Sequence, residues 1–253
     1  MMLTVKHLHF SRNKKTVLAV EDWAMESGQF VGVLGSNGAG KSTFLKLIAG
    51  EWRSSGRVLF HGSTLAEWNR QALACHLAVL PQSSQLSLPF TAGEVVALGA
   101  IPLTASRQQC NRLVNEAMER TCSAHLADAL FMELSGGEKQ RVQLARVLVQ
   151  LAQAKQEPLL LLDEPISAQD LAQQHAMMQL ARELAHERGW GVLAVLHDIN
   201  FAVRYCDSLC LLSKGKLVGH GQPGHCINPD VVEALWGHRP QRLVAEDGVA
   251  VYC

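Results

Sequence analysis

A glycine-rich segment, residues 35–42, shows the clearest chemistry in the sequence and reads Gly-Ser-Asn-Gly-Ala-Gly-Lys-Ser. Glycines let backbone N–H groups approach a ligand closely, and the lysine adds a positive charge. A triphosphate suits this set, because Lys41 would reach its outer phosphates and the Ser42 hydroxyl would bind Mg²⁺. The residues expected to surround the nucleotide are Gly35, Ser36, Asn37, Gly38, Ala39, Gly40, Lys41, Ser42 and Thr43.

The elements on either side of this segment decide whether the pattern is more than chance. Gln29–Leu34 is a short apolar run typical of a buried parallel strand, and Thr43–Ala49 continues with apolar residues at helical spacing. Strand, loop and helix is the order that a phosphate-binding loop requires. The alternative, a glycine-rich turn that binds nothing, needs neither a lysine nor a serine at these positions.

A pair of acids follows a second buried strand. The four leucines of Leu159–Leu162 predict a strand covered on both faces, which places Asp163 and Glu164 at its carboxyl end, where ligands bind in open α/β sheets. Two neighbouring carboxylates repel each other unless a cation is near, and Mg²⁺ prefers oxygen ligands. The alternative is an Asp–Glu pair that only caps a helix.

Three further side chains are candidates because of where they stand. Gln82 follows the predicted strand Leu77–Leu80, His197 follows Val192–Leu196, and Phe10 lies at the end of an N-terminal strand. Each has an ordinary alternative: a lone glutamine is usually solvated, a histidine at a strand end often caps, and a strand phenylalanine usually packs in the core. Their interpretation therefore depends on the motifs around them.

A second motif, Leu134–Glu138, reads Leu-Ser-Gly-Gly-Glu and stands before a predicted helix. Followed by Lys139, Gln140 and Arg141, it resembles the signature motif of the ATP-binding-cassette (ABC) ATPases. The resemblance covers nearly the whole chain. It implies an α/β protein with the P-loop NTPase fold of ABC ATPases, an antiparallel β subdomain and a helical subdomain, that binds ATP with Mg²⁺.

The same resemblance implies roles at the nucleotide. Glu164 is expected to be the general base that deprotonates the attacking water, and His197 to hydrogen-bond the γ-phosphate. Gln82 is expected to touch Mg²⁺ or the attacking water. Asp163 and Ser42 would then complete the metal site.

The resemblance also implies a second subunit. Ser135, Gly136 and Gly137 are expected to meet the ATP held by the other chain, so that two chains close head to tail on two ATP molecules. Asp170 lies in the segment that crosses to the opposite subunit in the family. Phe10 stands where the family places an aromatic that stacks on adenine, although which aromatic does so stays open.

One segment departs from the family's pattern. Residues 165–170 read Pro-Ile-Ser-Ala-Gln-Asp, where the family commonly has Pro-Thr-Ser-Ala-Leu-Asp. Asp170 is retained, so we expect communication between two nucleotide sites. Ile166 and Gln169 leave the local geometry of this segment open.

The predicted organisation is a single ABC ATPase domain over residues 1–253. Residues 1–90 and 150–253 would form the core with its β subdomain, and residues 91–149 the helical subdomain with the signature motif. The further predicted elements are strands at Leu3–Phe10, Thr16–Met25 and Gly56–His61, helices after the N-caps Thr91 (Ala92–Leu98) and Ser106 (through Thr121), and an exposed connector at Gln150–Glu157.

Composition excludes several classes of protein. The 23 basic and 23 acidic residues balance to zero net charge, which argues against a nucleic-acid partner. No run approaches the roughly 18 to 20 apolar residues of a membrane span, and the N-terminus lacks the apolar core of a signal peptide, so we expect a cytosolic chain. Seven cysteines without a Cys-x-x-Cys pair predict reduced, mostly packed thiols.

The segment Ser83–Gly99 resembles ATPases that import iron chelates, haem and cobalamin, and the stretch through Ala234–Gly237 looks most like the haem importers. The resemblance implies an ATP-hydrolysing homodimer on two transmembrane permease subunits, at the cytoplasmic side of the bacterial inner membrane, with a periplasmic binding protein as indirect partner. Ser83–Phe90 is expected to dock a permease helix, unless its apolar residues only anchor the helical insert.

Other transported substrates stay open at this point. The same machinery could import a ferric siderophore or vitamin B12. A soluble ABC ATPase without a transport role is less favoured, because such proteins usually have two cassettes, an inserted coiled coil or basic surfaces, and the sequence shows none of these.

Overall fold

The computed structural model describes residues 1–13, 15–82, 88–167 and 169–253. The chain divides into two compact units. The first contains residues 1–67 and 181–253, and the second contains residues 68–180. Helix α6 (Leu171–Arg188) begins in the second unit and ends in the first. The predicted finer boundaries near residues 90 and 150 stay a prediction.

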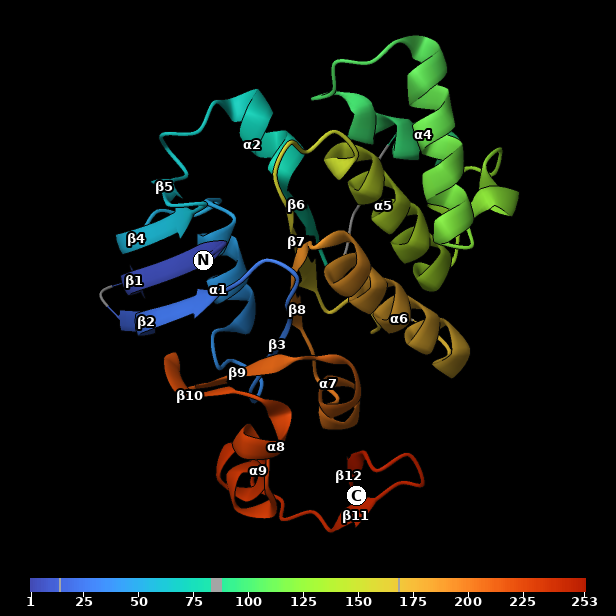
Figure 1. Cartoon of the computed structure of the whole chain (residues 1–253). Coiled ribbons are helices and arrows are strands. Elements are labelled where there is room, and N and C mark those ends of the chain that lie inside the picture. Colours follow the sequence, from blue (N-terminus) through green and yellow to red (C-terminus); the bar gives the residue numbers. More distant parts are fainter. Residues whose placement is uncertain (14, 83–87, 168) are drawn as a thin grey trace. The chain divides into compact units, whose positions relative to one another are not determined.

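The first unit opens with an antiparallel layer of β1 (Leu3–Arg12), β2 (Lys15–Met25), β4 (Ser55–Phe60) and β5 (Ser63–Thr64). Strand β1 lies between β2 and β4 and is antiparallel to both, as the blue arrows of Figure 1 show. The buried residues are Leu3, Val5 and Leu8 in β1 and Leu18, Val20, Trp23 and Met25 in β2, so burial alternates along each strand except at one break. The antiparallel strands predicted from alternation are therefore confirmed.

A parallel layer follows in the same unit. Strand β3 (Phe30–Leu34) pairs in parallel with β8 (Gly191–Val195) and β9 (Ser208–Ser213), and β9 pairs antiparallel with β10 (Lys216–Gly221). Every residue of β3 and β8 is buried, as expected for continuous apolar runs in a parallel sheet. Within this unit the strands run in the order β5-β4-β1-β2-β10-β9-β3-β8.

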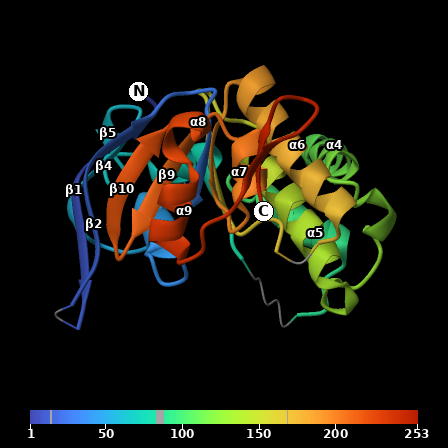
Figure 2. The same cartoon turned by 90° about the horizontal axis from the view of Figure 1, so that it is seen from below.

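The C-terminal part of the first unit comprises α7 (Ile199–Tyr205), α8 (Pro223–Cys226), α9 (Pro229–Trp236) and the hairpin of β11 (Arg242–Val244) and β12 (Ala250–Tyr252). The hairpin is tied back by Asn200, whose amide exchanges hydrogen bonds of 3.1 and 2.8 Å with the backbone of Tyr252. Figure 2 shows β12 beside α7.

The second unit is mainly helical around a parallel pair, β6 (Leu77–Leu80) and β7 (Leu159–Asp163). Besides the first part of α6, its helices are α2 (Arg70–His76), α3 (Ala92–Ala97), α4 (Arg107–Arg120) and α5 (Gly136–Leu151), with α4 packed on α5 in Figure 1. The remaining elements are short 3₁₀ turns at Leu98–Ala100, Ala124–Leu126 and Phe131–Glu133.

Both helix starts predicted in this unit are confirmed. Thr91 and Ser106 each accept a hydrogen bond from the third residue of the helix, and Glu94 and Gln109 each accept one from the capping residue's N–H. Each pair is a capping box, which satisfies two backbone donors at a helix N-terminus.

The predicted exposed connector at Gln150–Glu157 is wrong in its first part. Helix α5 continues through Leu151, which is buried, and the Gln150 amide donates to Ala74 O at 2.8 Å and to Leu77 O at 3.3 Å. The Lys155 N–H donates to His76 Nε2 at 2.9 Å. Glutamine-rich composition suggested solvation, whereas the Gln150 amide satisfies backbone groups of α2 and β6.

All seven cysteines are unpaired, and burial raises the pKa of the Cys206 and Cys210 thiols. In the described part of the chain, no helix combines the length and the apolar character that crossing a membrane would require.

Candidate functional site

The glycine-rich loop joins β3 to α1 (Lys41–Ile48) in the first unit, as predicted. A Cβ on Gly35 would lie 2.2 Å from the Leu212 carbonyl oxygen, and Gly40 has a φ of +104° directly before α1, so both positions require glycine. The Lys41 ammonium donates to Gly35 O at 2.8 Å and to Ser36 O at 3.2 Å. The loop is thus wrapped around a lysine only 6% exposed.

His197 emerges at the same edge of the sheet as this loop. In the parallel pair of β3 and β8, Val33 lies opposite Val195, and the Leu196 N–H donates to Val33 O at 3.1 Å. The residues that come after both strands therefore lie on one side of the sheet. His197 is exposed there, and Asp198 caps α7 through its carboxylate.

Phe10 packs on an aromatic that sequence reasoning missed. Its ring stacks on Trp52 with 5.2 Å between centroids and 23° between planes, and Lys46 Nζ lies 4.9 Å from the centre of the Trp52 ring. Phe10 also lines an open pocket of about 320 Å³ with His9, Ser11, Arg53, Ser54 and Ser55. In the sequence, the indication closest to a role for Trp52 was its position shortly after the helix that follows the glycine-rich loop.

In the second unit, Gln82 and Glu164 meet. Strands β6 and β7 are parallel with Leu80 opposite Leu162, so the residues after them reach the same edge. The Gln82 amide nitrogen donates to a Glu164 carboxylate oxygen at 2.6 Å. This contact spans 82 residues of sequence and places an amide on the predicted general base.

The predicted metal ligands Ser42, Gln82 and Asp163 can each offer an oxygen atom to a cation. Asp163 ends β7 with 8% of its surface exposed. The Gln82 nitrogen donates to Glu164, which leaves the amide oxygen as the atom that can bind a cation. No group of three or more His, Cys, Asp or Glu side chains suited to a metal occurs among the described residues. These donors fit Mg²⁺, which is usually bound by one or two carboxylates together with substrate phosphates.

The signature motif forms the N-terminus of α5. Ser135 is the N-cap, and its N–H and hydroxyl donate to a Glu138 carboxylate oxygen at 2.8 and 2.7 Å. These two bonds lower the pKa of the Glu138 carboxyl. Lys139 donates to Met132 O at 2.9 Å. Gly136 is exposed and Gly137 is buried, so the start of α5 is ordered by its own side chains.

The segment that departs from the family's pattern has a hydrogen-bond pattern of its own. Asp170 accepts the Gln173 N–H at 2.9 Å and so caps α6. The Gln169 amide donates to Gln140 Oε1 at 3.2 Å and to Pro165 O at 3.3 Å, and Ile166 is buried. Ala168 lies outside the described residues.

The predicted docking segment is described only in part, because residues 83–87 lie outside the described residues. Leu88 is 60% exposed, whereas Phe90 is half-buried and accepts the Phe131 N–H at 2.9 Å. Leu88 and Pro89 are therefore the described apolar residues of this segment that are exposed.

Sequence reasoning missed Gln140, whose amide donates to Glu164 O at 3.0 Å. Its only signal in the sequence was its position two residues after Glu138 on the signature helix.

The predicted residues divide between the two units. The loop with Ser42, His197 and Phe10 belongs to the first unit, and Gln82, Asp163, Glu164, Ser135 and Asp170 belong to the second.

Known proteins are similar to this chain in sequence and in fold. Residues 19–167 match the family described as ABC transporter. The hemin import ATP-binding protein HmuV of Shewanella denitrificans is 46% identical over 97% of each chain. The protein of the same name from Vibrio cholerae is 48% identical over 91% of this chain and 88% of its own.

A solved structure extends the comparison to the fold. The ATP-binding cassette MJ0796, dimeric in a post-hydrolysis state with ADP and Pi, is similar to this chain with a TM-score of 0.75 at 25% identity, covering 88% of this chain and 99% of that one. The predicted α/β ABC ATPase fold is thus confirmed. With its phosphate loop, its signature helix and relatives matched from end to end, this chain belongs to the ABC transporter family as one of its ATP-binding proteins.

Proposed function

We propose that this chain is the ATP-hydrolysing subunit of a multi-subunit importer that energises haem uptake across the bacterial inner membrane. The observation that most directly supports hydrolysis is the 2.6 Å hydrogen bond between Gln82 and Glu164, because it orients a carboxylate at the edge where β6 and β7 end. The choice of haem rests on relatives named as hemin import proteins that match almost the whole chain.

Binding of ATP would use the first unit. The loop N–H groups and the start of α1 suit the phosphates, and the Lys41 ammonium would exchange the carbonyl oxygens of Gly35 and Ser36 for charged phosphate oxygens. His197, at the same sheet edge, would donate to the γ-phosphate. Phe10 would stack on adenine beside its open pocket.

Hydrolysis would use the second unit. Glu164 would accept the proton of the attacking water, and Gln82 would hold the carboxylate and orient that water. Ser42, Asp163 and the Gln82 oxygen are the residues that would hold Mg²⁺. The bound ion would neutralise phosphate charge that develops during the transfer.

Transport across a membrane requires partner proteins, and we assign these partners from the family. Two copies of the chain would close on two ATP molecules, with Ser135, Gly136 and Gly137 of each copy meeting the ATP of the other and Asp170 at the crossing segment. The dimer would dock on two permease subunits at the cytoplasmic side of the inner membrane, through the segment that includes Leu88. A periplasmic binding protein would act on it only indirectly.

The substrate is tested by reconstitution. The chain and its permease subunits are placed in liposomes with the periplasmic binding protein, and ATP hydrolysis is measured with haem, a ferric siderophore or vitamin B12. Haem should stimulate hydrolysis and accumulate inside. Stimulation by either of the other two instead would reassign the substrate, and no stimulation or uptake by any of them would refute an import function.

A further inference from the structure

The backbone of Glu164 is held in an uncommon conformation. Its φ is +53°, in the left-handed region, which is unfavourable for a residue with a side chain of this size unless its surroundings compensate. Its carbonyl oxygen accepts the Gln140 amide at 3.0 Å and the Ser167 hydroxyl at 3.2 Å. Gln140 is only 6% exposed, so its amide is fixed by protein groups.

The polarity of these contacts defines a chain of two amides. A carbonyl oxygen only accepts, so Gln140 must present its NH₂ group to Glu164 O. Gln140 Oε1 then faces the other way and accepts the Gln169 NH₂ group at 3.2 Å. The Gln169 NH₂ group also donates to Pro165 O at 3.3 Å, so the Gln169 amide oxygen takes part in neither of these bonds.

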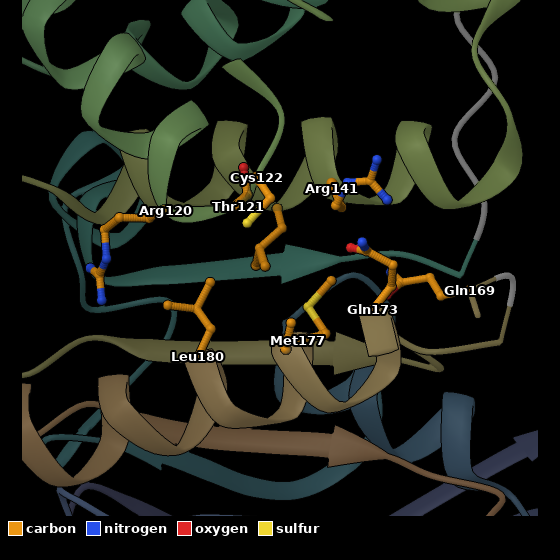
Figure 3. Close-up of a pocket in the computed structure, with 10 residues that line it drawn as sticks. Arg120, Thr121, Cys122, Arg141, Gln169, Gln173, Met177 and Leu180 are labelled. Atoms are coloured by element: carbon orange, nitrogen blue, oxygen red, sulfur yellow. The ribbon is translucent and has the colours of Figure 1, made fainter. Parts of the chain in front are cut away.

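The chain of amides ends at a small cavity. Gln169 Oε1 and Arg141 Nε are buried and have no hydrogen-bond partner among the residues that the structure describes. Both residues line a cavity of about 30 Å³, drawn in Figure 3, with Arg141 on α5 above it and Met177 and Leu180 on α6 below. That volume suits one water molecule, which could donate to Gln169 and accept from Arg141.

We propose that Gln169 and Gln140 are positioning residues for Glu164, acting as a hydrogen-bonded relay that a water bound between Gln169 and Arg141 completes. The inference rests on the proposed ATPase function. Gln169 stands where the family commonly has leucine, which can donate no hydrogen bond, so this relay is a property of the chain's own sequence. Its effect is to fix the peptide of Glu164, and with it the direction of the carboxylate that meets Gln82.

The test is a double-mutant cycle on ATP hydrolysis by the full chain, with Gln140→Met, Gln169→Leu and both together. Methionine keeps the length of Gln140 without the donor. We expect Gln140→Met to lower kcat about 10- to 100-fold, because small displacements of a catalytic group are costly, with the KM for ATP within about twofold. Gln169→Leu should lower kcat less, and in the Gln140→Met background it should have no further effect.

Gln150→Leu is the matched control. Gln150 also lies on α5, half-buried, and its amide also donates to backbone carbonyls, but those belong to Ala74 and Leu77. This variant should lower the melting temperature and leave kcat unchanged. Additive losses in kcat from Gln140→Met and Gln169→Leu, or losses that follow the melting temperature as in the control, would show a merely structural role and overturn the relay.

Two further results separate the relay from the proposed function. A wild-type chain that hydrolyses ATP alongside variants of unchanged kcat refutes the relay alone. A wild-type chain without hydrolysis, alone and with its permease subunits, refutes both. A crystal structure at high resolution should show the water within hydrogen-bond distance of Gln169 Oε1 and Arg141 Nε, and a dry cavity would remove the water from the proposal.

Discussion

At the scale of single residues, the two halves of the proposed chemistry are prepared differently. Lys41 is buried in its loop and already donates to two carbonyl oxygens, so the positive charge is in place before a nucleotide arrives. Glu164 is instead held from both ends, by Gln82 at the carboxylate and Gln140 at the backbone. Preorganisation of this kind lowers the cost of ordering groups at the moment of reaction.

Lys41→Ala should abolish productive ATP binding, because it removes the charge-assisted contact to the phosphates. We expect a Kd weaker by about 10- to 100-fold or more, on the order of the 1.5 to 3 kcal/mol typical of such hydrogen bonds. Calorimetric titration with ATP measures this, and circular dichroism checks that the variant is folded. Nearly normal turnover in this variant would refute the phosphate-loop assignment.

A histidine of β1 makes a pH-dependent contact that a single substitution can test. His7 Nδ1 lies 2.9 Å from Glu21 on β2, and this hydrogen bond raises the pKa of His7 above 6.5 and lowers that of Glu21 below 4.5. The His7 contribution to stability is therefore complete below pH 6.5 and is lost as pH rises through its folded pKa. The Glu21 contribution is lost as pH falls through its lowered pKa.

Glu21→Gln should return the pKa of His7 toward 6.5, because the charged acceptor is gone. The imidazole resonances of His7 followed by NMR from about pH 5 to about pH 9 give this value directly. An unchanged titration of His7 would contradict the contact.

At the scale of elements, the start of a helix is determined by residues that lie close together in the sequence. Ser106 and Gln109 satisfy each other's backbone donors at the start of α4, and Thr91 and Glu94 do so for α3. The signature helix α5 begins in the same way with Ser135 and Glu138. A motif that would meet a second ATP is thus placed on a helix end that is ordered before any partner arrives.

Ser106→Ala should destabilise the chain by about 1 kcal/mol, because the Gln109 N–H loses its side-chain acceptor. Chemical denaturation measures this, and ATPase activity should not change because α4 provides no residue to the proposed site. Ser106→Asp, which restores an N-cap acceptor, should recover the stability. Equal losses in both variants would mean that the cap does not contribute.

At the scale of the whole molecule, the proposed function predicts assembly that depends on nucleotide. Glu164→Gln keeps the shape of the side chain but removes the base, so ATP should bind and stay unhydrolysed. Two chains should then remain closed on two ATP molecules and elute as a dimer with ATP and Mg²⁺, but not with ADP. A variant that stays monomeric and hydrolyses normally would refute both the base and the dimer.

Leu88→Ser tests the permease contact. Leu88 is 60% exposed, so the substitution should leave the ATPase activity of the isolated chain within about twofold, as for most exposed sites. Co-purification with the permease subunits and haem uptake should be lost. Ile101, which is 77% exposed and apolar in the same unit, provides the control Ile101→Ser. Loss of basal activity and melting temperature together would identify Leu88 as a packing residue.

Much of this protein could be predicted from local sequence. The phosphate loop, the strand before it, the helix after it and the N-caps Thr91 and Ser106 depend on residues within a few positions of one another, and the structure has each of these elements where the pattern indicated. The double burial of β7 likewise follows from its own four leucines. Short-range hydrogen bonds and apolar periodicity determine such features, so the sequence alone suffices for them.

Only the tertiary structure decided which side chains meet across long stretches of sequence. The contacts of Glu164 with Gln82 and Gln140 span 82 and 24 residues, and Gln150 reaches back 76 residues to Ala74. Glutamine side chains are usually solvated, so the glutamine-rich composition predicted an exposed segment. In the structure, the buried amides instead satisfy backbone groups that would otherwise be unpaired. Which amide finds which carbonyl depends on strand register and helix packing, and those are set by the whole folded chain rather than by any segment of it.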